Sequence, residues 1–366
     1  MATITKTVDT IRRRNLLSSW WVSALFMLFS LYIFFVLLNV VIKGQCESNC
    51  VIGTLSQMLR LATPIAFAAF CGVMCERAGV VDIGIEGKML IAAMVAYGVN
   101  VFSFQIFKQI MDPATAGDVS RLLALILAVL SAMVTQALHA VVSIKFKVNQ
   151  IISGTVINIM ATGLTGYLYR AYLAENLPAG PGTFQAIAIP VLDKIPWLGT
   201  ILFDQKPLTY LMFILVFVIQ YVLFFTPWGL RTRAVGEHPR AADTLGIDVI
   251  KMRYANVLIG GLIAGLGGAW FTLEGVDVFN PGMTNGLGFI GLAAMIFGKW
   301  SPFGSLIGAM IFGLGSSVTT TVSFLRPDIP SQIPPMLPYV LTIIVLTGVV
   351  GRAIPPAADG VAYEKQ

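Results

Sequence analysis

The side chains best suited to chemistry lie in one short stretch of the chain. Asp82, Glu86 and Lys88 stand among glycines inside an otherwise apolar run, and Asn158 lies inside a later one. Asp82 and Glu86 are four positions apart, which places both carboxylates on one face if that segment is helical. Charges in apolar surroundings need a partner or a function. We expect either a polar lining for a hydrophilic solute or hydrogen-bonded clamps at a helix break, and favour the clamp for Glu86.

Two glycine-rich patterns resemble nucleotide sites but lack the context that such sites need. Gly286–Gly291 matches the dinucleotide fingerprint, yet it lies in an apolar segment rather than in a soluble βαβ unit. Gly84–Met89 resembles a phosphate-binding loop, but Asp82 stands where the pattern requires a glycine and Met89 replaces the serine or threonine. Neither histidine has a nucleophile nearby in sequence, and no Gly-x-Ser-x-Gly elbow is present. We therefore expect no enzyme, no ATP hydrolysis by this chain and no cofactor.

The cysteines give little support to a metal site. Cys46 and Cys50 can form a disulfide if their side of the protein is oxidising, whereas Cys71 and Cys75 lie in an apolar run. No histidine is close to either pair in sequence, so we expect no metal.

The composition identifies an integral membrane protein. Of 366 residues, 57% are hydrophobic and 11% are charged, against roughly 25% charged residues in soluble proteins. So few charges exclude a cytosolic enzyme, a nucleic-acid binder and a secreted disulfide scaffold. The excess of 24 Lys and Arg over 18 Asp and Glu fits basic residues retained on the cytoplasmic side.

Apolar runs predict an all-α fold with about ten transmembrane helices, each needing about 20 residues. The runs lie near 20–42, 52–74, 80–107, 121–144, 150–173, 208–226, 254–274, 286–298, 303–323 and 336–351. The third run is long, the eighth is short, and both contain glycines, which indicates broken or re-entrant helices. The first run is too long for a signal peptide, so we expect it to remain as an uncleaved helix.

The runs divide the chain into a transmembrane domain and two short tails. Residues 1–19 form a basic cytoplasmic tail, residues 20–351 the transmembrane domain, and residues 352–366 a cytoplasmic C-terminal tail. The loop at about 174–207 is external and rich in proline, so we expect a fixed shape. We expect this loop either to dock a partner or cover the pathway, or to act only as a solvated connector.

The cytoplasmic loop at about 227–253 contains the signals of a short helix. Pro239 suits a first helical turn, and Gly246 followed by Ile247 suits a left-handed helix end. A helix over Pro239–Leu245 is too short to be stable alone. We expect it to pack against the membrane domain or into another protein's groove.

A weak internal repeat joins the two glycine-containing runs. Gly87–Met94 is similar to Gly288–Met295, five runs later. Because five is odd, the two copies would cross the membrane in opposite directions, as in an inverted-repeat transporter. Matching glycines and alanines also arise by chance in apolar helices.

Three segments resemble a known family. Glu76–Gly87, Thr226–Ile247 and Gly288–Gly304 are similar, in this order, to signature segments of permease subunits of bacterial ABC importers for simple sugars and nucleosides. Asp82 and Lys88 depart from the pattern, which has asparagine and an apolar residue there. The two charges either neutralise each other or alter the pathway.

The resemblance implies one subunit of a larger importer in the cytoplasmic membrane. Its partners would be a cytoplasmic ATP-binding subunit, an extracytoplasmic solute-binding protein and a second permease, either a copy or a paralogue. The solute would be a nucleoside or, next, a simple sugar. The residues that would contact the ATP-binding subunit are Glu237, Pro239, Arg240, Ala241, Ala242 and Gly246. The alternative is a secondary carrier in which Asp82 or Glu86 binds a proton or sodium.

Overall fold

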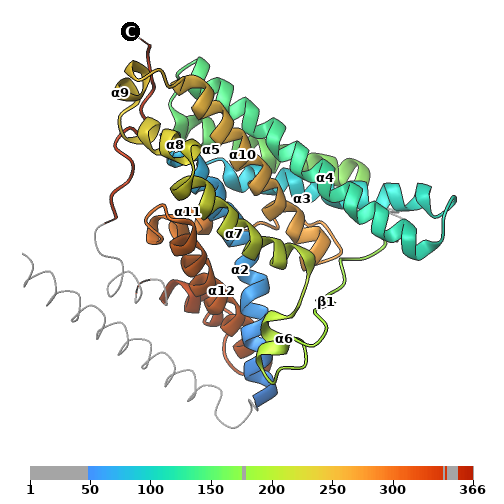
Figure 1. Cartoon of the computed structure of the whole chain (residues 1–366). Helices are drawn as coiled ribbons and strands as arrows, with labels where there is room; N and C mark the ends of the chain where they lie inside the picture. The colour runs from blue at the N-terminus through green and yellow to red at the C-terminus, as the bar shows by residue number, and fades with distance from the viewer. Residues whose placement is uncertain (1–47, 175–178, 341–342, 344–352, 366) are drawn as a thin grey trace, which may run out of the picture.

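The computed structural model describes residues 48–174, 179–340, 343 and 353–365, and these residues are almost entirely helical (Figure 1). The helices are α2 (Ser48–Glu76), α3 (Ile85–Phe107), α4 (Pro113–Ala140), α5 (Gln150–Leu168), α6 (Leu198–Leu202), α7 (Pro207–Phe225), α8 (Pro227–Glu237), α9 (Pro239–Thr244), α10 (Val249–Trp270), α11 (Leu287–Phe297) and α12 (Pro302–Leu325). Short π-helical turns, η1 (Val141–Lys145), η2 (Tyr169–Leu173) and η3 (Phe271–Gly275), extend α4, α5 and α10. A 3-10 turn, η4 (Pro334–Met336), follows α12.

The all-α membrane fold predicted from the sequence is confirmed. Seven helices of the described chain are long and apolar enough to cross a membrane, and α11 is a shorter apolar helix. These eight helices correspond to eight of the ten apolar runs. The run near 20–42, the tail 1–19 and Cys46 lie outside the described residues, as does most of the run near 336–351.

The third run contains a break at its start. Residues 77–84 form turns, and helix α3 begins only at Ile85. Asp82 therefore precedes the helix, and it does not share a helical face with Glu86. The apolar residues Val80, Val81 and Ile83 hide this break from a hydropathy pattern.

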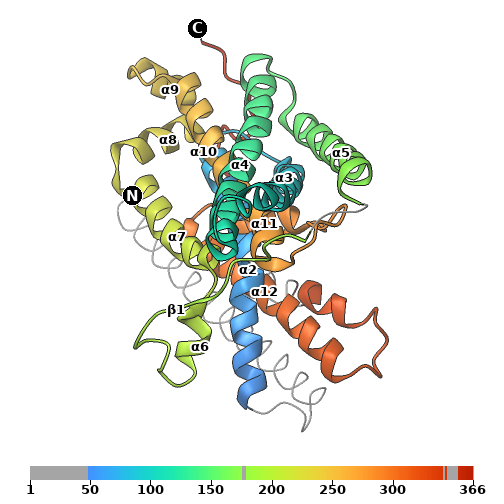
Figure 2. The ribbon, with the colours of Figure 1, turned by 90° about the vertical axis from the view of Figure 1, so that its right-hand side faces the viewer.

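Two groups of three helices pack on each other in matching ways. The first group is α2, α3 and α4, and the second is α10, α11 and α12. Helix α2 packs against α11 and α12, whereas α10 packs against α3 and α4. These helices form the centre of the molecule, with α5 at one edge (Figure 2).

Small residues allow α10 to approach its neighbours closely. Gly261 lies against Gln136, and Gly265 lies against Val129, both on α4. Ala269 joins a buried alanine cluster on the same helix pair. This packing replaces larger apolar contacts, which in lipid add little to helix association.

The described part of the external loop is folded. Strand β1 (Ile187–Ala188) pairs antiparallel with β2 (Asp204–Gln205), and α6 lies between them. The Phe184 amide donates to the Leu273 carbonyl at 2.7 Å, which ties the loop to the end of α10. The expected fixed shape is present in these residues.

Candidate functional site

Asp82 is the centre of a buried polar cluster at the α2–α3 junction, which we define as residues 77–84. Its carboxylate accepts hydrogen bonds from Lys88 Nζ at 2.5 Å, Gln136 Nε2 at 2.8 Å and the Gly84 amide at 3.1 Å. Both side chains of the Asp82–Lys88 pair are fully buried. The opposite charges and the hydrogen bonds together offset the cost of burying either charge. The two departures from the family pattern therefore neutralise each other.

Helices α4 and α5 hold the backbone on either side of Asp82. The Val81 amide donates to Gln150 Oε1 at 2.6 Å, and the Val81 carbonyl lies 3.0 Å from His139 Nε2. His139 Nδ1 lies 3.0 Å from the Ser153 hydroxyl. Because a carbonyl only accepts, His139 carries its hydrogen on Nε2 and accepts from Ser153. The junction is thus fixed from three helices.

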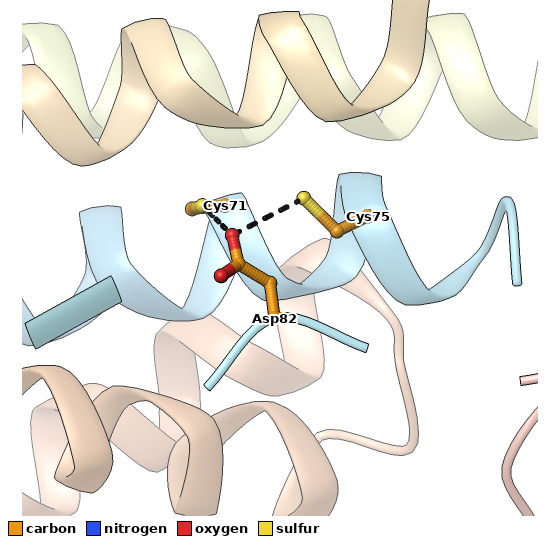
Figure 3. Close-up of side chains that lie close together, drawn as sticks. All are labelled: Cys71, Cys75 and Asp82. Carbon is orange, nitrogen blue, oxygen red and sulfur yellow. Dashed lines mark hydrogen bonds between the residues drawn. The ribbon is translucent and has the colours of Figure 1, made fainter. Parts of the chain in front are cut away.

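Cys71, Cys75 and Asp82 form a group with the spacing of metal ligands (Figure 3). Their ligand atoms lie within 4.8 Å of one another. The two thiols approach Asp82 Oδ2 at 3.9 and 3.8 Å. Lys88 already supplies a positive charge to this carboxylate, and a structural zinc site takes four ligands. The group is therefore better described as a hydrogen-bonded cluster than as a metal site.

Glu86 joins the starts of two helices. It lies in the first turn of α3, and its carboxylate accepts from the amides of Gly286 at 2.8 Å and Gly288 at 2.7 Å. These amides begin α11 and have no partner within that helix. A carboxylate at this position also favours the positive end of the helix dipole. Gly288 permits the contact, because a Cβ there would lie 2.7 Å from Glu86.

Asn158 holds the start of α3 from the side of α5. Its Oδ1 accepts from the Gly87 amide at 2.8 Å, and its Nδ2 donates to the Ile83 carbonyl at 3.0 Å. Asp82, Glu86 and Asn158 are therefore all bonded to backbone at or beside helix breaks. These contacts are those of the clamp interpretation, and each of the three side chains accepts at least one hydrogen bond from a backbone amide.

The first and third signature segments meet at the end of α2. Trp300 Nε1 donates to Glu76 at 2.5 Å, and Arg77 Nε donates to the Trp300 carbonyl at 2.9 Å. Gly236, from the second segment, lies directly against the Arg77 carbonyl. Residues far apart in the sequence thus form one connected region on the α8–α9 side of the molecule.

The segment for which coupling is expected, which we call the coupling segment, consists of α8, α9 and Gly246. Helix α9 has the predicted local structure, whereas α8 was not predicted. Pro239 begins α9, which ends at Thr244, and Gly246 adopts a left-handed φ of 79°. The Ile247 amide folds back to the Ala242 carbonyl at 3.1 Å. This geometry is the glycine-terminated helix end that the sequence indicates.

The surface of α9 is divided between a packed and a free face. Ala242 is buried in a cluster with Val235, Val249 and Met252. Glu237, Arg240 and Ala241 are exposed, and Leu245 is 81% exposed. Helix α9 therefore packs on the membrane domain with one face and presents a leucine and an arginine on the other.

Gln136 and His139 belong to the site but were not predicted to. Each lies in an apolar run of α4, more than fifty residues from its partner near Asp82. A polar residue inside an apolar run was the one available signal. It indicates burial against another polar group but does not identify that group.

Comparison with known proteins identifies similar chains. Residues 54–350 match the family model described as "Branched-chain amino acid transport system / permease component". The guanosine ABC transporter permease protein NupQ of Bacillus subtilis is 41% identical over 83% of this chain and 94% of its own length. The nucleoside ABC transporter permease protein NupC of Lactococcus lactis is 38% identical over 85% of this chain and 96% of its own.

A further relative has a different named solute. The putative glucose ABC transporter permease protein TsgC13 of Haloferax volcanii is 34% identical over 72% of this chain and 75% of its own length. No solved structure shows a significant match.

Proposed function

Since the chain belongs to the family of permease components of the branched-chain amino acid transport system type, we propose that it is the membrane-spanning subunit of an ABC importer for nucleosides. The similarity to NupQ and NupC over nearly their full lengths carries this proposal, because both are named for guanosine or nucleosides. The similarity to a putative glucose permease is lower and covers less of each chain. A simple sugar is therefore the second candidate.

The proposed importer contains three further components. A cytoplasmic ATP-binding subunit supplies energy, an extracytoplasmic solute-binding protein delivers the nucleoside, and a second permease completes the pathway. The protein lies in the cytoplasmic membrane with both termini inside. The family match favours this arrangement over the secondary carrier considered above.

The coupling segment is the proposed contact with the ATP-binding subunit. The contacting residues are Glu237, Pro239, Arg240, Ala241, Ala242 and Gly246. The exposed Leu245 supports this assignment, because an exposed leucine beside an arginine suits insertion into a partly apolar groove with acidic residues. Closure of two ATP-binding subunits would move this segment and change the side to which the pathway opens.

Asp82, Glu86 and Asn158 are proposed to act on transport by holding the helix breaks in place. The hydrogen bonds described above support this role over direct contact with solute. Truncation of any of them is expected to change folding and transport together.

Uptake by the purified system tests the function. Proteoliposomes that contain the permease, its ATP-binding subunit and its solute-binding protein should accumulate labelled guanosine only when ATP is supplied. Glucose under the same conditions is the control for the second candidate. Accumulation of guanosine by the permease alone, driven by a proton or sodium gradient, would favour the carrier instead.

Reversal of the charge at α9 tests the coupling assignment. Arg240→Glu combined with Glu237→Arg should abolish ATP-dependent uptake and weaken copurification of the ATP-binding subunit. Lys251→Glu is a control at an exposed cation on α10. Normal uptake and copurification by the double variant would refute the assignment.

A further inference from the structure

The C-terminal tail, residues 353–365, lies along the coupling segment. Residues 361–364 lie opposite the start of α9, near the top of the molecule in Figure 1. The Ala358 amide donates to the Gly236 carbonyl at 2.9 Å, and the Ala357 amide donates to Glu237 Oε2 at 3.1 Å. These bonds attach the tail to the last turn of α8, directly before α9.

The same tail is attached to the membrane domain on its other side. Arg253 of α10 donates from Nη1 to the Val361 carbonyl at 2.8 Å. The Asp359 side chain faces Glu76 at the end of α2. Lys147, beyond the end of α4, pairs with Glu364 at 2.6 Å. The tail therefore connects the coupling segment to three membrane helices.

Beyond these attachments, the tail and α9 together form the walls of a cavity. The lining residues are His238, Pro239, Arg240, Ala241, Val361, Ala362, Tyr363 and Glu364. Half of the lining thus comes from each segment. The Tyr363 ring packs against the apolar cluster that holds α9.

We propose that the surface receiving the ATP-binding subunit is composite, made by α9 together with residues 361–364 of the C-terminal tail. This inference rests on the proposed function, because it takes the ATP-binding subunit as the partner. A helix as short as α9 has no stability of its own, so its exposed face depends on what supports it. The tail provides part of that support and half of the cavity wall, and Arg240 at the cavity favours an acidic partner group.

Photo-crosslinking within the assembled transporter tests the surface without removing any contact. A benzophenone amino acid at Val361 and one at Ala241 should both crosslink to the ATP-binding subunit. Ile354 is the matched control, because it is an exposed apolar residue of the same tail outside the cavity lining. Crosslinking at Ala241 but not at Val361 would overturn the composite surface. Crosslinking of Val361 to lipid or to a second permease, and not to the ATP-binding subunit, would also overturn it.

A binding measurement gives the energetic test. Tyr363→Ala in the full chain should weaken binding of the ATP-binding subunit about tenfold, as for truncation of a buried interface aromatic. Lys365→Ala, at the exposed neighbour outside the cavity lining, should bind like the wild type. Unchanged binding by the Tyr363 variant would overturn the proposal and leave the proposed function intact. If the wild type bound no ATP-binding subunit, the proposed function would fail together with it.

Discussion

The α2–α3 and α10–α11 junctions have the same place in the two three-helix groups but different surroundings. At the α2–α3 junction, Ala78, Val80 and Asp82 are fully buried, and side chains of α4 and α5 bond to the backbone. At the α10–α11 junction, which we define as residues 276–286, Val276 and Val278 are 51% and 46% exposed. The bonds within it are mainly those of short turns.

The difference shows that two junctions with corresponding places in the fold need not be held equally firmly. The α2–α3 junction lies on the coupling side and is held by buried charges. The α10–α11 junction lies beside the loop that contains Gly180 and Gly182, and its backbone has fewer partners. Local opening requires few buried contacts, so we expect it to be easier at the α10–α11 junction.

Removal of Lys88 is expected to have the largest effect on this comparison. Lys88→Leu leaves Asp82 buried without its counter-charge, which should lower the free energy of unfolding by about 3–5 kcal/mol. Thermal unfolding in detergent measures the change. Adding Asp82→Asn to the same variant removes both charges and should restore most of the stability. A stable Lys88→Leu single variant would mean that the charge pair does not fix the junction.

Neutralisation of Glu86 should have the second largest effect. Glu86→Gln keeps the size of the side chain but replaces two charge-assisted hydrogen bonds to the start of α11, with an expected loss of about 2 kcal/mol. Asp277→Asn, at an exposed position of the α10–α11 junction, is the control and should change stability by less than about 0.5 kcal/mol. Equal losses in the two variants would contradict the difference between the junctions.

A matched pair of valines measures burial at the two junctions directly. Val80→Ser places a hydroxyl group in a fully buried position and should cost about 2 kcal/mol, whereas Val278→Ser should cost little. Both substitutions make the same chemical change, so the difference between their unfolding temperatures reports the surroundings alone. Comparable temperatures would show that the α2–α3 junction opens as readily as its counterpart.

The smallest expected effect is a pH dependence of the tail. Burial raises the pKa of Asp359 to about 6, and Glu76 and Arg253 are the charged groups that face it. The folded state thus holds a proton more tightly than a free carboxyl group does. Docking of the tail is therefore firmest at low pH and weakens as the pH rises through about 6. Hydrogen exchange at Ala358 should become faster relative to its intrinsic rate as the pH rises from the free value of 3.8 to about 6, and should then level off.

Asp359→Asn provides the control for this effect, because asparagine does not titrate in this range. Its exchange at Ala358 should be independent of pH after the same correction. A pH dependence that survives in the variant would assign the titration to another group.

Most of the long apolar helices and both ends of α9 were predictable because they depend on local sequence, whereas α8 and the start of α4 at Pro113 were not predicted. Apolar runs located α4, α5 and α7, and Pro239 with Gly246 located both ends of α9. The break before Ile85 was not predictable, because the residues around it are as apolar as a helix. The neighbours of Asp82 were also hidden, since Gln136 and His139 reach it from a separate helix. The docked tail has no periodic pattern, so only its contacts in the fold reveal it.

Glu86 has a consequence for how the two halves of the bundle can shift. Its side chain belongs to the first half and holds the tip of α11 in the second, so separating these two tips would leave two amides without acceptors. The large rearrangement with the lowest free-energy cost therefore keeps the contact between Glu86 and α11 in place and tilts the two helix groups around it. Such a rotation about the Glu86 contact would narrow the opening at one end of the bundle and widen the opening at the other end.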